Sequence, residues 1–427
     1  MIKYFAIKNF RSFKDEQIFE LDLHLDKNTP YVAQPTVGVA GANASGKSNL
    51  LQALSFVIWF MQDSFLRLDE NNDIPCPTFM TQGKQATQFH LIFAQMMTIK
   101  NQKKSIDESK LIDFEYELKL TEKNVITEKL FYYPFGRKRK VYSRSGNTIQ
   151  YGKDISAIET KDLRVNCSVV AFAAQFASQE IASTCRDYKI FSNLTYKGLK
   201  EVKFTPELIK KFKRRKQLDK ISEMLKIADI GIEKIEYSEI KEANEKIKEL
   251  SDIFIELRKK GEKINTIIIN KFDRDIGMLA RLAPGQVIFK HRIEHNLIDF
   301  TGDLESSGTL QFLIILSEVI DALENGSLVI LDEIELKLHQ NLVAYIIGLF
   351  QNPSENQHGS QLIFSFHNSF FMELLTPEQL WFTEKNAQGY TELFSAAAFE
   401  KDIKEIYQKD LEMLYRVGRF GAKPRGL

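Results

Sequence analysis

The stretch Gly41-Ala42-Asn43-Ala44-Ser45-Gly46-Lys47-Ser48 constrains this chain more than any other part of its sequence. It follows the apolar run Val37-Gly38-Val39-Ala40 and opens a helical pattern over residues 47 to 62. Between a strand and a helix, a G-x-x-x-x-G-K-[ST] string points successive backbone N–H groups at phosphate oxygens, and the helix presents its positive N-terminus to the same anion. The stretch therefore predicts a phosphate-binding loop in an α/β fold.

Several residues of this loop have predicted roles. We expect Lys47 to reach the β- and γ-phosphates as a catalytic and nucleotide-binding residue, and Ser48 to be a ligand of Mg²⁺. The other residues predicted to bind nucleotide are Gly41, Asn43, Gly46 and Asn49. A glycine-rich turn that matches by chance is the alternative, and the strand before the loop and the helix after it argue against that.

Composition sets broad limits on the protein. With 427 residues, 44% of them hydrophobic, the chain is long enough for a large core and for more than one compact unit. Its formal net charge of +1 does not indicate nucleic-acid binding by the whole molecule, so any such contact would need a local basic patch.

The cysteines and the hydropathy pattern indicate the setting of the protein. Cys76, Cys167 and Cys185 form no C-x-x-C pair, which is typical of a reducing, cytoplasmic setting without disulfides or zinc. No apolar run reaches the length of a membrane span, so no membrane partner is expected.

The run Leu328-Val329-Ile330-Leu331-Asp332-Glu333 delivers two carboxylates to the end of an apolar strand. We expect Asp332 to hold Mg²⁺ and Glu333 to be catalytic, by polarising the water that attacks the γ-phosphate. A strand that ends in a solvated acidic turn is the alternative. The phosphate loop favours the catalytic interpretation, because it implies the Mg²⁺ that such acids bind.

A third apolar strand, Ile363-Phe364-Ser365-Phe366, ends in His367. A neutral imidazole there can hydrogen-bond the γ-phosphate, so His367 is a third candidate catalytic residue. Such a histidine is otherwise often structural.

The segment Leu304-Glu305-Ser306-Ser307-Gly308-Thr309 precedes a helical pattern over residues 310 to 323. Small hydroxyl and glycine residues at a helix start can form a second anion site. An ordinary N-cap explains Ser306 or Ser307 equally well.

The remaining pattern outlines the domains. Alternating or apolar segments predict strands at 1–8, 18–25, 89–93, 114–120, 125–133, 327–331 and 361–366. The three strands between residues 89 and 133 are expected to be antiparallel, whereas the last two suit a covered parallel sheet. Basic and amphipathic segments, including a single packed helix at 240–257 and a short strand at 232–237, predict an inserted helical lobe. The predicted divisions are 1–194, 195–262 and 263–427.

The order of these motifs resembles the ABC-type ATPase head shared by RecF and the SMC proteins. The resemblance implies that two chains sandwich ATP and Mg²⁺ between the phosphate loop of one and the signature of the other. Ser306 and Gly308 resemble the signature Ser and second Gly of L-S-G-G-Q, with Ser307 in place of the first Gly. Arg11, within Asn9-Phe10-Arg11-Ser12-Phe13, resembles a basic residue near the nucleotide.

The same resemblance implies a glutamine that contacts Mg²⁺. The candidate is Gln175, within Val170-Ala171-Phe172-Ala173-Ala174-Gln175-Phe176, and Gln179 competes with it.

A closer resemblance covers nearly the whole chain. It rests on Asp229 to Ile232, Glu305 to Thr309, Asp332 to Glu335 with Leu338-His339, Glu384-Lys385-Asn386 and Tyr415 to Ala422. These segments resemble the OLD-like, AAA-type ATPases of bacterial phage-defence systems, including RloA/AbiLi-like proteins and, more loosely, AriA of the PARIS systems. That resemblance implies a TOPRIM-type nuclease acting in trans, because only about sixty residues follow His367 and they lack a D-x-D cluster.

Some weaker features have open alternatives. The basic run 210–216 could contact DNA or a protein, although a solvated helix face is more common. Residues 136–140 suit a basic hairpin turn. His291 and His295 lie in an alternating pattern, where they would share a strand face, but they lack a third metal ligand. The basic tail, from Arg416 to Arg425, suits a docking segment or a frayed end.

The sequence thus predicts a cytoplasmic ABC-type ATPase, an α/β head interrupted by a helical lobe, that forms a nucleotide-dependent homodimer or a larger assembly of dimers. The expected output is antiviral: the ATPase senses a phage protein or altered DNA and controls a nuclease partner. One alternative is a RecF-like, ATP-dependent DNA clamp in repair. Another is a scaffold that holds ATP and barely hydrolyses it.

Overall fold

The computed structural model describes residues 1–22, 32–82, 85–100, 107–134, 136–153, 160–176, 196–199, 215–227, 231–239, 285–302, 304–336, 338–399 and 411–421. The chain divides into two compact units. The first contains residues 1–200, 321–336 and 346–427, and the second contains residues 201–320 and 337–345. The domain bounds drawn from the sequence stay a prediction.

A six-stranded sheet carries the phosphate-loop strand of the first unit. Its order is β16 (Thr391–Ser395), β15 (Leu380–Lys385), β3 (Thr36–Ala40), β14 (Gln361–Ser365), β13 (Leu328–Leu331) and β9 (Tyr196–Leu199). The strands from β15 to β9 are parallel to their neighbours, and β16 is antiparallel to β15. Every residue of β3, β13 and β14 is buried, which explains their continuous apolar runs.

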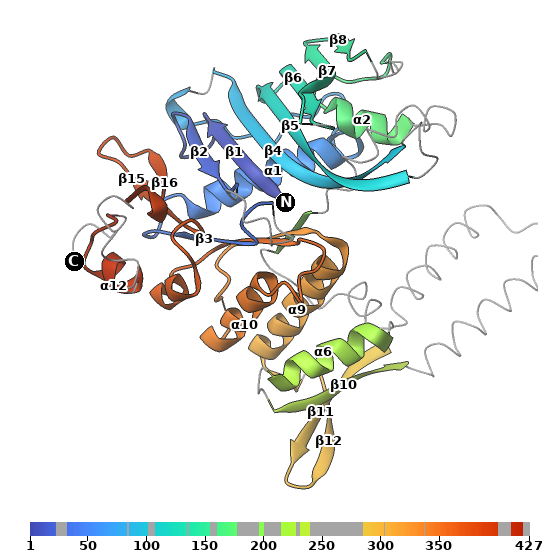
Figure 1. The fold of residues 1–427 in the computed structure, drawn as a ribbon, viewed down its shortest axis with the longest axis vertical. Helices are drawn as coiled ribbons and strands as arrows, with labels where there is room; N and C mark the ends of the chain where they lie inside the picture. Colours follow the sequence, from blue (N-terminus) through green and yellow to red (C-terminus); the bar gives the residue numbers. More distant parts are fainter. Residues whose placement is uncertain are drawn as a thin grey trace, which may run out of the picture. The chain divides into compact units, whose positions relative to one another are not determined.

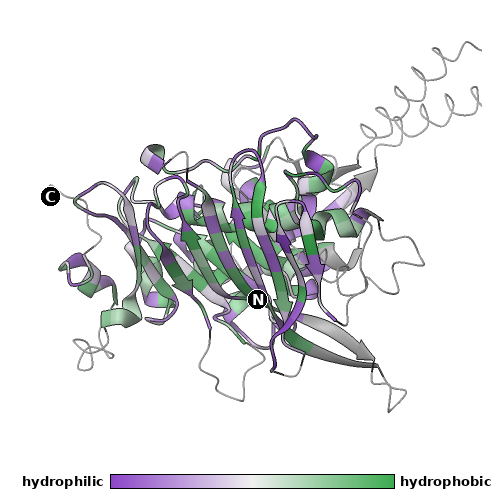
Figure 2. Cartoon of the chain, turned by 90° about the horizontal axis from the view of Figure 1, so that it is seen from above, coloured by the Kyte–Doolittle hydropathy of each residue, from purple (hydrophilic) through white to green (hydrophobic). Residues whose placement is uncertain are grey.

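A second, seven-stranded sheet is antiparallel throughout. Its order is β2 (Gln17–Glu20), β1 (Ile2–Lys8), β4 (Thr87–Lys100), β5 (Asp107–Leu120), β6 (Val125–Tyr132), β7 (Arg139–Ser145) and β8 (Thr148–Tyr151). Hydrophobic and hydrophilic residues alternate along its strands (Figure 2), as expected where one sheet face packs on a core and the other faces water. The antiparallel strands and the basic hairpin turn predicted from the sequence are confirmed.

Helix α1 (Lys47–Arg67) begins at the phosphate loop and lies between the two sheets (Figure 1). It contacts β14, β13 and β9 of the six-stranded sheet. On the other sheet's side its Phe56 ring lies 5.5 Å from that of Phe89 and 6.3 Å from that of Phe10. Side chains on most of the circumference of α1 are apolar. A helix of this kind is buried only when it is covered on two sides, here by the two sheets.

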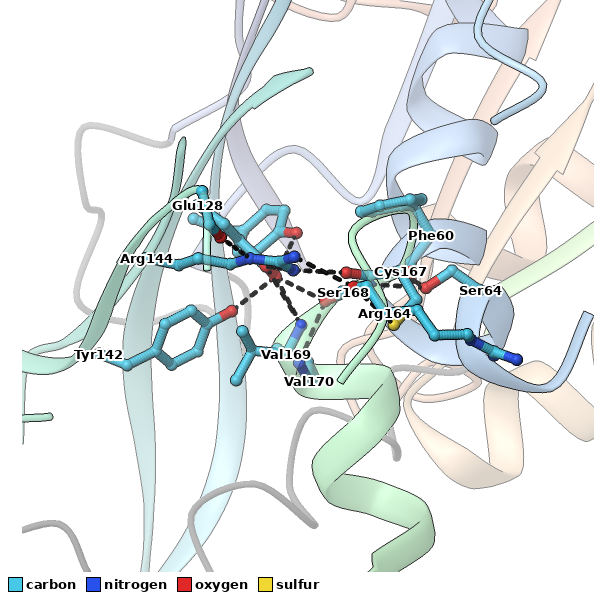
Figure 3. A network of polar contacts seen from close by, with 12 residues as sticks. Phe60, Ser64, Glu128, Tyr142, Arg144, Arg164, Cys167, Ser168, Val169 and Val170 are labelled. Carbon is cyan, nitrogen blue, oxygen red and sulfur yellow. Dashed lines mark hydrogen bonds and ion pairs between the residues drawn. The ribbon is translucent and has the colours of Figure 1, made fainter. Parts of the chain in front are cut away.

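A buried polar network ties the antiparallel sheet to helix α2 (Val169–Phe176), as Figure 3 shows. The Glu128 carboxylate accepts hydrogen bonds from Tyr116 OH (2.9 Å), Tyr142 OH (2.7 Å), Ser168 Oγ (2.6 Å) and Val169 N (3.1 Å). Arg144 Nη1 lies 3.6 Å from the same carboxylate. Burial, followed by the Glu128 charge, raises the pKa of Tyr116 well above its usual value. The carboxylate thus caps α2 at its N-terminus, where helices favour negative charge.

The second unit contains a small antiparallel sheet covered by a helix. Its strands are β10 (Ile232–Glu239), β11 (Gly285–Ile293) and β12 (Asn296–Thr301), and α6 (Arg215–Ile227) packs on β10. The predicted strand at 232–237 is confirmed as β10. The expectation that His291 and His295 share one strand is wrong, because β11 ends at Ile293 and a turn with φ of 54° at Glu294 follows. The predicted helix at 240–257 lies outside the described residues.

The remaining elements complete the described chain. Two helices run across the division between the units, α9 (Ser307–Asn325) and α10 (Gln340–Gln351). The first unit also has short helices at η1 (Met80–Gln82), η2 (Ser369–Leu374), η3 (Ala396–Phe399) and α12 (Leu411–Arg416). The predicted α/β class, with a phosphate-loop sheet beside an antiparallel sheet, is confirmed. Within the described ranges, no helix combines the length and apolarity that crossing a bilayer requires.

Candidate functional site

Three adjacent strands deliver the predicted catalytic residues to one edge of the six-stranded sheet. Because β3, β14 and β13 are parallel, their carboxyl ends lie at the same edge, where open α/β sheets bind ligands. The first leads into the phosphate loop, the second into His367 and the third into Asp332 and Glu333. The structure therefore brings together residues that are more than 280 positions apart in the sequence.

The loop backbone needs glycine at two positions. Gly41 has φ of 144° and Gly46 has φ of 122°, a region that L-residues with a side chain rarely adopt. A Cβ on Gly41 would lie 2.3 Å from the Thr383 carbonyl oxygen, and one on Gly46 would lie 2.5 Å from Thr391 Oγ1. Backbone conformation and close packing both exclude larger residues here.

Lys47 is buried at the centre of the site, with 5% of its surface exposed. Its Nζ donates hydrogen bonds to Gly41 O (2.7 Å) and Ala42 O (3.1 Å), and it lies 3.4 Å from His367 Nδ1. Burial lowers the pKa of Lys47, and the charge of Glu333, followed by the other nearby acids, opposes that shift. The ammonium is therefore a poorly solvated charge that an added anion would stabilise.

Ser48, Asp332 and Ser365 form a chain of oxygen atoms. Asp332 Oδ1 accepts hydrogen bonds from Ser48 Oγ (3.0 Å) and Ser365 Oγ (2.6 Å). A hydroxyl beside a carboxylate is the hard oxygen donor set that Mg²⁺ prefers, so these residues fit the metal that the sequence implies. Ser365 was not among the predicted site residues, although a polar residue in an otherwise apolar strand was a usable sign of it.

Glu333 and His367 face each other beside Lys47. Glu333 Oε1 lies 3.5 Å from His367 Nε2, and both side chains are about half-exposed, at 47% and 38%. The Glu333 backbone has φ of 53° and is held by a hydrogen bond from its N–H to Ser365 Oγ (2.8 Å). A left-handed conformation costs a residue with a side chain roughly 1–2 kcal/mol, and such strain is concentrated at functional sites.

Glu335 is a further charged residue of the cluster, and it was not among the predicted site residues. Its Oε1 accepts hydrogen bonds from the backbone N–H groups of His367 and Asn368. Its Oε2 is buried, and no residue in the described part of the chain donates a hydrogen bond to it. The site therefore contains a carboxylate oxygen with unused hydrogen-bonding capacity.

Three other predicted nucleotide-binding residues surround the loop. Asn43 is exposed on the loop itself. Asn49 Nδ2 donates a hydrogen bond to Ser12 Oγ (2.7 Å). Arg11 is exposed, has φ of 48° and places its guanidinium 5.8 Å from the centre of the Phe10 ring. The direct contact of these residues with a nucleotide stays a prediction.

The predicted signature residues Ser306, Ser307 and Gly308 lie in the second unit, at the start of α9. Ser306 Oγ accepts a hydrogen bond from Thr309 N (3.0 Å), so this serine is an N-cap. A role in binding nucleotide across a dimer stays a prediction.

The predicted metal ligand Gln175 is exposed on α2, whose start is anchored to the other end of α1 by a hydrogen bond from Ser168 N to Ser64 Oγ (2.9 Å). Its role also stays a prediction. Gln179 lies outside the described residues.

A separate group, His90, Glu115 and Glu117 on β4 and β5, places its potential ligand atoms within 4.8 Å of one another. Its charges are already balanced. Lys138 Nζ lies 2.6 Å from Glu115, and Lys129 Nζ lies 2.7 Å from Glu117. Although burial opposes the shift, hydrogen bonds from Lys138 and Tyr133 lower the pKa of Glu115. Two lysines would repel a cation, so this group is a partly buried ion-pair network.

One protein-family model matches most of the chain, over residues 37–373. It is described as "AAA domain, putative AbiEii toxin, Type IV TA system". The matched range contains the phosphate loop, the acidic strand end and His367. No curated protein matches the sequence.

Solved structures of SMC heads are similar to this chain over most of their length. The SMC head domain from Thermotoga maritima is 14% identical, with a TM-score of 0.37 over 92% of this chain and 98% of that one. An SMC head bound to the C-terminal winged-helix domain of ScpA is 13% identical, with a TM-score of 0.43 over 94% and 99%. An SMC head with an extended coiled coil, bound to the C-terminal domain of ScpA derived from Pyrococcus furiosus, is 14% identical, with a TM-score of 0.41 over 96% and 99%.

Proposed function

The chain belongs to the AAA-domain family of AbiEii type whose model it matches, and on that premise we propose that it is an ABC-type ATPase that binds and hydrolyses ATP. One observation carries this proposal. Lys47 and Ser48 at the start of α1, the acids after β13 and His367 after β14 meet at one sheet edge. A basic residue, a metal-binding oxygen pair and a general base are the groups that phosphoryl transfer to water requires.

Each residue has a distinct part in the proposed reaction. Lys47 and the N–H groups of the loop bind the β- and γ-phosphates. Glu333 orients the attacking water and accepts its proton, and His367, 3.5 Å from the Glu333 carboxylate, hydrogen-bonds the γ-phosphate. Ser48 and Asp332 would hold Mg²⁺, which neutralises phosphate charge when it is bound. Ser365 fixes both the Asp332 side chain and the Glu333 backbone.

We further propose that two chains form the working unit, as a homodimer or a larger assembly of dimers. The signature residues 306–308 of one chain would then meet the nucleotide held by the loop of the other. This rests on the resemblance of the signature and on the position of Ser306 at the N-terminus of a 19-residue helix, which favours an anion. ATP contacts that exist only in the closed dimer would shift the population towards it.

The proposed biological role is antiviral defence. The family description, with its reference to a toxin and a type IV toxin–antitoxin system, supports it, and so does the resemblance to phage-defence ATPases. In this proposal the ATPase senses a phage protein or altered DNA and controls a TOPRIM-type nuclease supplied in trans.

ATP turnover by the purified protein tests the enzymatic part. We expect Mg²⁺-dependent release of phosphate by the wild type and its loss in Glu333→Gln, which should still bind ATP. Glu117 lies on β5 of the antiparallel sheet and is partly exposed, so Glu117→Gln is the matched control and should keep wild-type turnover. Turnover that survives Glu333→Gln would contradict the assigned chemistry, and absence of ATP binding by the wild type would contradict the proposal as a whole.

Phage plating tests the biological part. Cells that carry the native locus should reduce plaque numbers, and cells with a Lys47→Ala version should not. Protein purified from that locus should bring a nuclease with it. A protein that purifies alone, dimerises with ATP and binds DNA with a steep salt dependence would instead support a RecF-like clamp.

A further inference from the structure

Ser45, just before the second glycine of the phosphate loop, is held from two sides. Its side-chain Oγ lies 2.6 Å from Thr383 Oγ1, and its carbonyl oxygen accepts a hydrogen bond from Thr391 Oγ1 (2.7 Å). Both threonines are fully buried, and Ser45 is 3% exposed. A buried hydroxyl pair and a buried carbonyl leave little freedom to rotate the Ser45 peptide groups.

The Thr391 contact belongs to a longer chain of hydrogen bonds. Thr391 Oγ1 also lies 2.9 Å from Ser12 Oγ, which accepts a hydrogen bond from Asn49 Nδ2 (2.7 Å). Thr391 N donates to Ser12 O (2.8 Å) as well. These hydrogen bonds therefore connect the start of β16 to the loop before Lys47 and to the first turn of α1.

Steric contacts reinforce these hydrogen bonds. The positions of the Thr383 carbonyl and the Thr391 side chain leave no room for a Cβ on either loop glycine. The loop therefore lies directly against the β15–β16 hairpin and cannot shift towards it.

The hairpin itself is firmly anchored. Residues Leu380 and Phe382 of β15 pair with Gly38 and Ala40 of β3, so Thr383 follows the last paired residue. The Phe382 ring stacks on Tyr415 and Phe420, with ring centres 5.7 Å and 5.1 Å apart. Strand β15 is thus fixed by pairing with β3 and by packing on two aromatic rings, so Thr383 is held rigidly enough to fix the position of the loop.

We infer that Thr383 and Thr391 are positioning residues of the nucleotide site: they hold Ser45 so that the N–H groups of Gly46 and Lys47 point at the phosphates. The inference rests on the proposed binding of ATP. Neither threonine touches the nucleotide; both act through Ser45. Without either hydroxyl, the loop would sample orientations that bind phosphate poorly.

Threonine-to-valine variants test this role, because valine keeps the shape of threonine and lacks its hydroxyl. We expect Thr383→Val and Thr391→Val each to raise the Kd for MgATP about 5- to 10-fold, the effect of one buried hydrogen bond. Thr383→Ser and Thr391→Ser retain the hydroxyl and should stay within about twofold of the wild type. Binding is measured by titration calorimetry, with thermal unfolding of the nucleotide-free protein in parallel.

Thr36→Val is the matched control. Thr36 is fully buried at the other end of β3, where its Oγ1 accepts a hydrogen bond from Gln351 Nε2 (3.2 Å). This variant should lose similar thermal stability and keep the wild-type Kd. The inference is overturned if Thr36→Val weakens ATP binding as much as the hairpin variants, or if the hairpin variants bind normally.

Two further outcomes separate the inference from the proposed function. A wild type that binds no MgATP overturns both, whereas normal binding by the wild type and by both valine variants overturns the positioning role alone. If Thr391→Val does not fold, Thr383→Val carries the test, because the hydroxyl that it removes bonds to a side chain rather than to the backbone.

Discussion

Two clusters of charged residues lie within the first unit, and they use hydrogen bonds in opposite ways. In the Glu128–Arg144 cluster, the carboxylate accepts hydrogen bonds from two tyrosines, a serine and a backbone N–H. Arg144 donates to the carbonyl oxygens of Gly146, Cys167 and Arg164, and both charged side chains are at most 1% exposed. This cluster is saturated.

The cluster around Lys47 is not saturated. Lys47 donates to carbonyls of its own loop, Glu333 is held in a left-handed conformation and Glu335 Oε2 has no donor among the described residues. Glu333 and His367 are also half-exposed. In a polar cluster that stabilises a fold, the donors and acceptors bond to one another. In a cluster suited to a ligand, some hydrogen-bond acceptors stay unused and some backbone conformations are strained.

The largest expected effect comes from breaking the saturated cluster. Glu128→Ala leaves the Arg144 guanidinium buried without its partner, and we expect the free energy of unfolding to fall by about 3–5 kcal/mol. Chemical denaturation measures it. Glu117→Gln, which removes a partly exposed partner of Lys129, is the control and should cost less than about 1 kcal/mol. A Glu128→Ala protein as stable as that control would contradict the structural role.

The reverse pattern is expected for Lys47→Ala. ATP hydrolysis should fall about 100- to 1000-fold, because the phosphates lose a preorganised cation. The free energy of unfolding should change by less than about 1 kcal/mol, since the charge that is removed was poorly solvated. Steady-state kinetics and denaturation of the same preparation measure both. A loss of stability as large as that of Glu128→Ala would remove the distinction between the clusters.

A smaller effect concerns the strain at Glu333. Glu333→Gly should raise the free energy of unfolding by about 1 kcal/mol, because glycine adopts φ of 53° without steric cost. Hydrolysis should be lost in the same variant. Glu333→Gln keeps the Cβ and should lose hydrolysis without this gain in stability. Equal unfolding midpoints for the two variants would show that the backbone conformation stores no strain.

The smallest effect is a pH dependence. Burial holds the pKa of Lys47 below 10.5, so between that lowered pKa and 10.5 the unfolded chain binds more protons at this group than the folded chain does. Below this window, burial of the charged Lys47 lowers the free energy of unfolding by a constant amount. As the pH rises through the window, this loss becomes smaller and the free energy of unfolding rises. The unfolding free energy of the wild type minus that of Lys47→Met should rise by about 1 kcal/mol or less from pH 7.5 to 10. A constant or falling difference would contradict burial as the cause.

Local patterns made the centre of the site predictable. The loop 41–48 is recognisable because its glycines, lysine and serine are consecutive, and Asp332, Glu333 and His367 stand where apolar strands end. Parallel pairing of β13, β14 and β3 then brings them together. The contact between Ser48 and Asp332 is thus a consequence of motif and topology alone.

The supporting residues could not be predicted in the same way. Thr383 and Thr391 lie in ordinary strand sequences, where threonine is common for its branched side chain. Their importance arises only from pairing β15 with β3, which no local pattern encodes. Likewise, Glu128 stands between Thr127 and Lys129, and Arg144 between Ser143 and Ser145, so no apolar neighbour in the sequence marks either charge as buried. Their burial depends on α2 covering that part of the sheet.

The strand order has a consequence for protein synthesis. The phosphate loop is made early, but its strand β3 pairs only with β14 and β15 in the described chain, and Thr383 follows Ser45 by 338 residues. At translation rates of roughly 5–20 residues per second, tens of seconds separate these segments. A nascent chain therefore contains the phosphate-loop sequence long before it contains the strands and threonines that hold the loop in place. If the loop binds ATP as proposed, that binding would begin only after synthesis has passed the β15–β16 hairpin.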